Sequence, residues 1–365
     1  MIAALLALYA VTAVALPAGQ SVDLPQAASG SPGSNAALPT SLALSRRGSL
    51  AMIVHSTTRD ERFETRLIVI RADGTRVAVP PPPASVISSI SQNGAANFAG
   101  VALADDGTPF ATMAIAFSGA YSGEDEGVLI WNGTNWRNPL AGRALPIDPK
   151  NATIAAAETP AHFVCNGNYT YTFGSPDDAA GNPHYLENQT AAVDATEMTS
   201  LGYGEATAMR DGFVVGFSAA LGLIEYGQPH PSTALEWTGG QRTALGPGVA
   251  YGVNAAGVAV GDDEASYGAN GKPTLWRNGR AIRLSDAPGS AYAIADDGTI
   301  VGVAGGRAFL VRGVDTARTI VLLDSLVERG WHITGAYAIA AGGRILAIGN
   351  RDGGAPGVLL LDPKP

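Results

Sequence analysis

Short apolar runs separated by polar, glycine-containing turns recur along the chain. The clearest copies are "YGVNAAGVAVG" from Tyr251, "YAIADDGTIVG" from Tyr292 and "YAIAAGGRILAIG" from Tyr337, and "ATAMRDGFVVG" from Ala206 is related to them. In each copy a glycine stands six places after the start, between two apolar runs. Glycine supplies the positive φ that a tight hairpin turn needs, so each phrase predicts two antiparallel strands.

A third apolar run follows each hairpin after a loop of variable length, as in "TALEWTGG" from Thr233 and "PTLWRNGR" from Pro273. This run ends in Asn-Gly, Asp-Gly or Gly-Gly and a shorter strand comes next, so a unit has four antiparallel strands. Weaker copies of the opening phrase bring the units to seven, with starts near Leu42, Ser88, Ala152, Ala206, Tyr251, Tyr292 and Tyr337.

These starts are 41 to 64 residues apart, an interval typical of a repeat array. A four-stranded sheet with two apolar faces is stable only between neighbours, and a ring of such sheets covers every face. The sequence therefore predicts an all-β fold, a single β-propeller domain over residues 19–365 with seven blades of four antiparallel strands. Residues 101–203 fit the period poorly and could hold one blade or two; a β-sandwich or two all-β domains is the alternative.

The ends of the chain bear on how such a ring closes. The last unit supplies three strands before the chain ends in "DPKP". We expect an N-terminal strand, "SVDLP" from Ser21, to complete the last blade. Helix is expected only in "IVLLDSLVERGWHIT", where Leu322, Leu323, Leu326 and Val327 lie at helical spacing.

The first residues, "MIAALLALYAVTAVALPAGQ", form an apolar run of about 16 residues, which is shorter than a membrane span. Small residues at Ala13, Ala15 and Ala18 flank Pro17 and resemble a cleavage site. Residues 1–18 are therefore predicted to be a signal peptide, with a buried first helix or strand as the alternative. A cleaved chain would be secreted, periplasmic or on the cell surface of a bacterium, with no stable membrane span.

The segment "LLDSLVERGWHITGAYAIAAGGRILAIGNRDGGAPGVLLLDP" resembles the HAF-type extracellular repeat of bacterial secreted proteins. The matching positions are Asp324, Leu326, Gly330, Trp331, Ala338, Ile339, Gly343, Ile345, Gly349 and Val358 to Leu361. The resemblance is clear from about residue 204 to the end, faint from 40 to 100 and poor from 101 to 203. It implies a secreted, propeller-like fold and carries over no catalytic residues.

Charge and motifs narrow the functions to be considered. The net charge is −9 and no basic stripe occurs, which argues against nucleic acid as a partner. No nucleophile elbow, phosphate loop or dinucleotide fingerprint is present, so no cofactor is expected. The single cysteine, Cys165, is expected to be a buried apolar residue. Acidic residues in the turns at Asp105 and Asp296 are expected to be solvated, although Ca²⁺ binding by loop carboxylates is a further possibility.

The largest departure from the period is the segment "CNGNYTYTFGSPDDAAGNPHYLENQT". Its aromatic and amide side chains suit a carbohydrate or peptide surface, because ring faces stack on a ligand while amides donate hydrogen bonds. The candidate ligand-binding residues are Tyr169, Tyr171, His184, Tyr185, Trp131 and Trp136. No catalytic residue and no metal ligand is predicted.

The preferred hypothesis is a non-catalytic, secreted binding module for a glycan, a peptide or a surface protein. The alternative is a secreted polysaccharide hydrolase or lyase, because acids from different blades could meet on the axis of a propeller. Converging carboxylates or a histidine in a central pocket would favour the enzyme.

Overall fold

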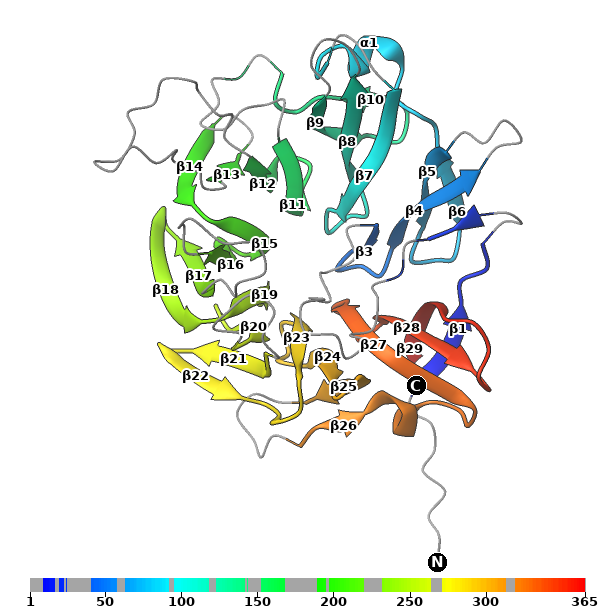
Figure 1. Ribbon diagram of the computed structural model, residues 1–365, viewed down its shortest axis with the longest axis vertical. Helices are drawn as coiled ribbons and strands as arrows, with labels where there is room; N and C mark the ends of the chain where they lie inside the picture. Colours follow the sequence, from blue (N-terminus) through cyan, green and yellow to red (C-terminus); the bar gives the residue numbers. More distant parts are fainter. Residues whose placement is uncertain are drawn as a thin grey trace, which may run out of the picture.

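Seven antiparallel sheets surround a central axis (Figure 1). The computed structural model describes residues 9–16, 20–22, 24, 41–57, 63–91, 95–117, 123–141, 143, 152–167, 189–194, 197–219, 232–263, 271–312 and 319–364. Within this part of the chain the fold is a seven-bladed β-propeller, as the repeats predicted. Residues 101–203 contribute one complete blade and most of another.

The blades follow one another in chain order, and within each blade the strands are named from the axis outward. The first blade consists of β3 (Leu42–Leu44), β4 (Leu50–Thr57), β5 (Phe63–Ile70) and β6 (Arg76–Val79), and the second of β7 (Ala95–Leu103), β8 (Pro109–Phe117), β9 (Gly123–Trp131) and β10 (Trp136–Arg137). The third blade consists of β11 (Ala152–Thr159), β12 (His162–Gly167), β13 (Gln189–Val193) and β14 (Met198–Tyr203), and the fourth of β15 (Glu205–Arg210), β16 (Phe213–Ala219), β17 (Ser232–Thr238) and β18 (Gln241–Pro247).

The last three blades complete the ring. They are β19 (Val249–Val253), β20 (Ala259–Asp262), β21 (Pro273–Arg277) and β22 (Arg280–Arg283); β23 (Gly289–Ile294), β24 (Ile300–Ala304), β25 (Arg307–Val311) and β26 (Val321–Leu322); and β27 (Trp331–Ile339), β28 (Ile345–Arg351), β29 (Gly357–Pro363) and β1 (Tyr9–Ala13).

Turn chemistry explains why adjacent strands pair where they do. The β15–β16 turn consists of Asp211 at φ 46° and Gly212 at φ 84°, and the β21–β22 turn consists of Asn278 at φ 50° and Gly279 at φ 71°. Two positive φ angles in a two-residue loop match the twist of the flanking strands, and Asp-Gly and Asn-Gly adopt them readily. These dipeptides therefore set the strand register.

Two local expectations need correction. The stretch expected to be helical forms β26 and a single 3-10 turn, η1 (Leu323–Leu326), because Leu323 and Leu326 are needed in the core and the chain returns at once to β27. In the second blade, the hairpin turns at Gly107 rather than in the phrase from Ser88, since "ADDGT" supplies the turn there. A short helix, α1 (Ala84–Ile87), precedes that blade; no helix in the described ranges is long and apolar enough to span a bilayer.

An N-terminal strand closes the ring, but it is not the strand expected. β1 pairs antiparallel with β29, from Tyr9 opposite Pro363 to Ala13 opposite Leu359. The expected strand at Ser21 instead forms β2 (Gln20–Ser21), which pairs with β4 in the first blade. β1 is the better closing strand because Tyr9, only 2% exposed, joins the apolar cluster between the sixth and seventh blades.

The N-terminal segment therefore holds two blades together. β1 is the outermost strand of the seventh blade. β2 belongs to the first blade, where β2 and β3 pair with different parts of the same strand, β4. Val14 and Leu16, which connect these strands, pack on the cluster between the two blades. Cleavage after Ala15 or Ala18 would remove β1, so closure of the seventh blade depends on whether these residues are retained.

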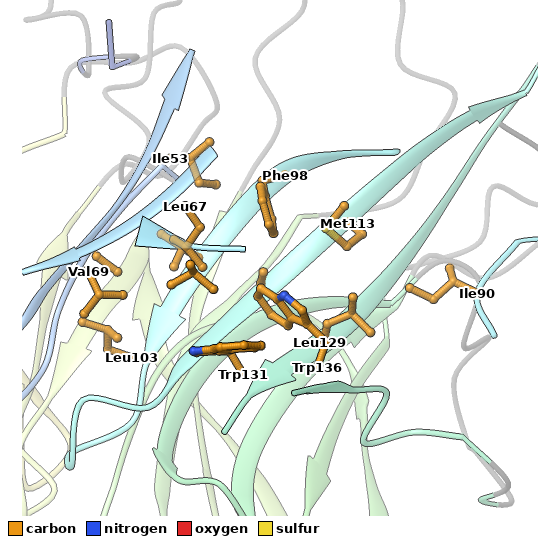
Figure 2. Packing of buried hydrophobic residues seen from close by; sticks show 14 of the residues in the cluster. Ile53, Leu67, Val69, Ile90, Phe98, Leu103, Met113, Leu129, Trp131 and Trp136 are labelled. Atoms are coloured by element: carbon orange, nitrogen blue, oxygen red, sulfur yellow. The ribbon is translucent and has the colours of Figure 1, made fainter. Parts of the chain in front are cut away.

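The core consists of seven apolar clusters, one at each junction between neighbouring blades. Alternate residues of one strand serve opposite junctions: Ala51 and Ile53 of β4 face the second blade, whereas Leu50 and Met52 face the seventh. Figure 2 shows the junction of the first and second blades, where Ile53 and neighbouring side chains meet those of β7, β8 and β9. Each sheet is thus covered on both faces.

Most innermost strands share a further feature. β7, β15, β19 and β23 each contain one register shift, and β11 and β27 each contain two; each shift leaves one residue without a partner on the next strand. Tyr251, Tyr292 and Tyr337 are such extra residues in the last three of these strands. Their rings form a ladder with centroid separations of 5.3 Å and 5.0 Å. Burial raises the pKa of Tyr337 to about 12 and also raises the pKa of Tyr292, so these two rings remain neutral packing elements.

Replacement of Tyr9 by alanine tests the closing strand. We expect Tyr9→Ala to lower the free energy of unfolding by about 3 kcal/mol, because it removes a buried aromatic ring from a packed junction. Thr12→Ala, at an exposed position of the same strand, is the control and should be nearly neutral. Urea denaturation of both variants measures the difference. Equal stability of the two would mean that β1 does not complete the blade.

Candidate functional site

The turns that join each innermost strand to its neighbour meet on one face of the ring, around the axis. Ala341 N–H of the seventh turn donates to Arg46 O of the first at 2.9 Å, and Asp105 N–H of the second donates to Glu158 O of the third at 2.8 Å. Ala255 N–H of the fifth turn donates to the Asp296 carboxylate of the sixth at 3.0 Å. These contacts join turns from six blades, and Arg210 of the fourth connects them. We call this surface the axial face.

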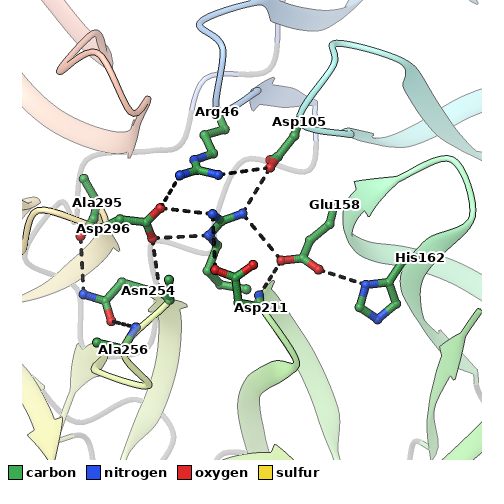
Figure 3. A network of polar contacts seen from close by, with 11 residues as sticks. Arg46, Asp105, Glu158, His162, Asp211, Asn254, Ala256, Ala295 and Asp296 are labelled. Carbon is green, nitrogen blue, oxygen red and sulfur yellow. Dashed lines mark hydrogen bonds and ion pairs between the residues drawn. The ribbon is translucent and has the colours of Figure 1, made fainter.

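Arg210 is the centre of an ion network on the axial face (Figure 3). Its guanidinium lies 3.1 Å from Asp105, 3.0 Å from Asp296 and 3.6 Å from Glu158. Asp211, the next residue, is 3.4 Å away. The Arg210 side chain is only 13% exposed. One largely buried guanidinium therefore contacts carboxylates from four different blades, its own included.

Arg46, from the first blade, is the second cation of the network. It lies 2.6 Å from Asp296 and 3.7 Å from Asp105, so both carboxylates are shared between two arginines. Two cations and four carboxylates leave this network with a formal charge of −2, since Asp105, Glu158, Asp211 and Asp296 outnumber Arg46 and Arg210.

The two "ADDGT" turns explain how the aspartates reach the axis. In each, the second aspartate accepts a hydrogen bond at 2.8 Å from the threonine N–H two residues later: Asp106 from Thr108, and Asp297 from Thr299. This bond stabilises the turn. The first aspartate, Asp105 or Asp296, can then contact the arginines. These residues are not simply solvated, contrary to the expectation from sequence.

The network shifts the acidities of its members in different directions. Burial would raise the pKa of Asp296, but the hydrogen bond from Ala255 N–H and the charges of Arg210 and Arg46 outweigh burial and lower it below its ordinary value. For Asp105, burial outweighs the two arginines and the pKa is raised. Burial would lower the pKa of Arg210, but its carboxylate partners raise it, so this guanidinium stays charged.

Glu158 extends the network toward the third blade. Its carboxylate accepts a hydrogen bond from Asp211 N–H and lies 2.8 Å from His162 Nδ1. His162 Nε2 lies 3.5 Å from Asp194. A carboxylate-paired histidine beside other acids is a pattern that acid-base chemistry could use, but Asp105, Glu158, Asp211 and Asp296 each also contact an arginine.

An open cleft of about 590 Å³ lies beside the network, where the seventh blade meets the first. Its lining is Arg46, Arg47, Gly48, Ala72, Asp105, Ala340, Ala341, Gly342, Arg344 and Asp362. Three arginines and two aspartates give this lining a formal charge of +1, although the whole chain carries −9. No aromatic residue lines the cleft. Its polar groups and size suit a small hydrophilic ligand.

The arginines of the cleft are held to different degrees. Arg344 is fixed, because Nε contacts Asp362 and Nη1 donates to Gly48 O at 2.9 Å and Ala72 O at 3.3 Å. Arg47 is exposed and has no ion pair with another residue in the described ranges. It therefore presents a charged donor group that no neighbouring side chain neutralises.

Two of the residues proposed from sequence as ligand contacts, Trp131 and Trp136, are not in the lining of this cleft. Tyr169, Tyr171, His184 and Tyr185 belong to residues 168–188, outside the described residues. Trp131 and Trp136 are 8% and 5% exposed, and their rings pack together at 5.6 Å. Trp136 Nε1 also donates to Pro80 O at 2.7 Å. These two rings are packing elements of the junction in Figure 2, with little surface left for a ligand.

The arginines of the network were not expected from sequence, although a signal was present. Arg46, Asp105, Glu158, Arg210 and Asp296 stand in or beside the hairpin turn of five different blades. Charges of both signs at this place in the repeat predict ion pairs across the ring once the turns are known to converge. Among the residues with described positions, no group of three or more His, Cys, Asp and Glu could hold a metal ion. Cys165 is fully buried, and burial raises the pKa of its thiol.

Comparisons with known proteins support the architecture. No protein-family profile and no curated protein sequence matches the chain, so the resemblance to HAF-type repeats stays a prediction. The β-propeller domain of the Trilobed protease from Pyrococcus furiosus, described as having an open velcro topology, is similar in structure. Its TM-score is 0.55 at 10% identity, over 88% of this chain and 94% of that one.

Two further structures have lower TM-scores of 0.43 at 11% identity. The Hadza microbial sialidase Hz136 matches over 88% of this chain and 64% of its own length, and YCF48 from Cyanidioschyzon merolae matches over 97% and 99%. Of these similarities, only the one to the propeller domain of the Trilobed protease, with a TM-score above 0.5, supports the fold.

Substitution of Arg210 tests the central role of the ion network. We expect Arg210→Met to lower the free energy of unfolding by about 2 kcal/mol at pH 7, between the values for exposed and buried ion pairs, because its partners are partly solvated. Arg280→Met, on the exposed outer strand β22, is the control. The measurement is urea denaturation. A loss no greater than that of the control would mean that the network does not stabilise the ring.

Asp296 should contribute stability in a pH-dependent way. Its folded-state pKa lies below the unfolded value near 3.8, so its contribution is fully present above that value and is lost as the pH falls through the folded pKa. The difference in unfolding free energy between wild type and Asp296→Asn should therefore be constant near neutrality and shrink below about pH 3.8.

Asp297→Asn in the same turn is the matched control, because an Asn oxygen can still accept the hydrogen bond from Thr299 N–H. Denaturation curves at pH 7 and pH 3 measure both variants. A difference for Asp296→Asn that is unchanged at pH 3 would contradict the shift.

Proposed function

We propose that the protein is a non-catalytic binding module that works outside the cytoplasm, and that its ligand binds on the axial face. The observation that carries this proposal is the arginine-lined cleft beside an ion network whose carboxylates are already occupied. A binding site needs donors in a concavity, and there Arg344 supplies a fixed donor and Arg47 an exposed one.

Occupied carboxylates argue for binding rather than catalysis. A general acid must hold a proton at working pH, and a nucleophile or base must reach the substrate unimpeded. Glu158 and Asp296 each accept a backbone N–H and contact an arginine, and Asp105 contacts two arginines. At Glu158 and Asp296 these contacts take up oxygens that a substrate would need, and the arginines help to hold the pKa of Asp296 below its ordinary value.

The rival proposal, a polysaccharide hydrolase or lyase, has one observation in its favour. Acids and a histidine from neighbouring blades do converge near the axis, and the pKa of Asp105 is raised. If this were an active site, wild type would release reducing ends from a polysaccharide and Glu158→Gln would not. Equal release by the two proteins is the result we expect.

A glycan and peptide array tests the binding proposal. We expect the wild-type chain to bind members of the array, and a variant with residues 168–188 replaced by a two-residue turn to bind them equally well. The replacement is feasible because Gly167 and Gln189 are paired neighbours on β12 and β13. The reason for equal binding is that the cleft lies in other blades.

Loss of binding in the shortened variant would instead locate the site in the segment that contains Tyr169 and Tyr185. Absence of binding by the wild-type chain to any glycan or peptide would overturn the proposed function.

A further inference from the structure

The geometry points to an acidic sugar as the ligand of the cleft: we propose that Arg47 and Arg344 bind the carboxylate of a uronic acid residue in an oligosaccharide, while Asp105 and Asp362 accept its hydroxyl groups. This inference rests on the proposed function and specifies its ligand.

Arg344 provides a fixed, positively charged donor group in the cleft. Asp362 and two carbonyl oxygens engage its Nε and Nη1, so the plane of the guanidinium is fixed before any ligand arrives. Its Nη2 has no hydrogen-bond partner among the residues with described positions. A planar, preorganised donor with one free edge is well matched to a carboxylate, which has two acceptor oxygens.

Arg47 adds a second donor from the neighbouring blade. It belongs to the first blade, whereas Arg344 belongs to the seventh and reaches across the junction to Gly48 O and Ala72 O, so both arginines line one cleft. The lining also contains the small residues Gly48, Ala341 and Gly342. A side chain added at Gly342 would meet nothing within 4 Å, so the lining is open at this residue.

The aspartates decide between classes of anion. A polyglutamate peptide or a phosphate offers few hydroxyl donors, so its charged oxygens would lie next to Asp105 and Asp362 without hydrogen bonds to offset the repulsion. A uronic acid carries one carboxylate and several hydroxyl groups, and hydroxyl groups donate hydrogen bonds to carboxylates. The mixture of arginine and aspartate around the cleft therefore fits a sugar acid better. Without an aromatic side chain in the lining, the cleft offers no stacking platform for a neutral sugar.

The position of the cleft predicts that a bound ligand stabilises the folded protein. The cleft spans the junction at which the ring closes, since all of its lining except Asp105 of the second blade comes from the first and seventh blades, and Asp362 lies on β29, the strand that pairs with β1. A ligand that contacts both walls adds a link across this junction. Binding should therefore raise the melting temperature of the protein, because only the closed ring has both walls in place.

The test uses the full chain with trigalacturonic acid, and galactotriose as its neutral counterpart. We expect calorimetry to show binding of trigalacturonic acid, weakening with added salt, and a rise in melting temperature. Arg47→Gln should weaken this binding at least tenfold, because a charged donor is lost from the carboxylate. The control, Arg280→Gln, makes the same charge change on β22, away from the cleft, and should bind as wild type does. Arg47 is exposed, so both variants should retain the melting temperature of the unliganded wild type.

Other outcomes separate this inference from the proposed function. Equal binding of galactotriose and trigalacturonic acid, or equal binding by Arg47→Gln, would overturn the uronate assignment and leave the binding module standing. Tighter binding of tetraglutamate or of inorganic phosphate than of the trisaccharide would also overturn it, in favour of a peptide or a simple anion. If none of these probes binds while the array shows another ligand, the uronate assignment is wrong and the binding-module proposal stands. If the wild-type chain binds nothing on the array, both are wrong.

Discussion

Apolar residues on both faces of every sheet are the constraint on which this structure depends. Val214 and Val215, adjacent on β16, belong to clusters on opposite sides of the fourth blade. A sheet of this kind cannot expose either face to water without a large loss of hydrophobic free energy, so each blade requires two neighbours. A ring satisfies this requirement for all blades, whereas an open row would leave two faces uncovered.

Closure of the ring brings together residues that are remote in sequence. β1 pairs with β29, and the segment after β1 continues into the first blade. The same closure places Arg47 and Arg344 on the two walls of one cleft. The concavity therefore exists because the first and last blades meet, and the element that closes the fold also shapes the candidate site.

The axial face shows how a repeat can acquire chemistry without losing its fold. The hairpin turns need glycine and a turn-capping side chain, and these needs are met by Gly298 and Asp297 in the sixth blade. The residue before Asp297 is not required to cap the turn, so Asp296 can form ion pairs with the arginines of the network. Different blades carry opposite charges at this position: Arg46 stands in the first blade, and Asp105 and Asp296 stand in the second and the sixth. The turns therefore attract one another through ion pairs, whereas carboxylates in every blade would repel.

Much of this fold could be read from the sequence, because a hairpin phrase is a local signal. The glycine after "YAIADD", the Asn-Gly of β21–β22 and the apolar runs around them depend on neighbouring residues only, and they sufficed to predict seven four-stranded blades. The helix expected near Leu323 failed because helical spacing of leucines is ambiguous when the chain has only one turn in which to bury them.

The site lay largely beyond such a reading. Trp131 and Trp136 were plausible ligand contacts by residue type, but their place between two blades buries them. Arg210 and Arg46 carry no local signal, since their partners lie as far away as Asp296. The sequence by itself thus determined the four-stranded blade, through turns and two-sided apolar patterning, and predicted seven blades while leaving their number over residues 101–203 open. Only the tertiary structure decided which strand closes the ring and which charges meet, because both depend on the ring bringing distant segments within contact distance.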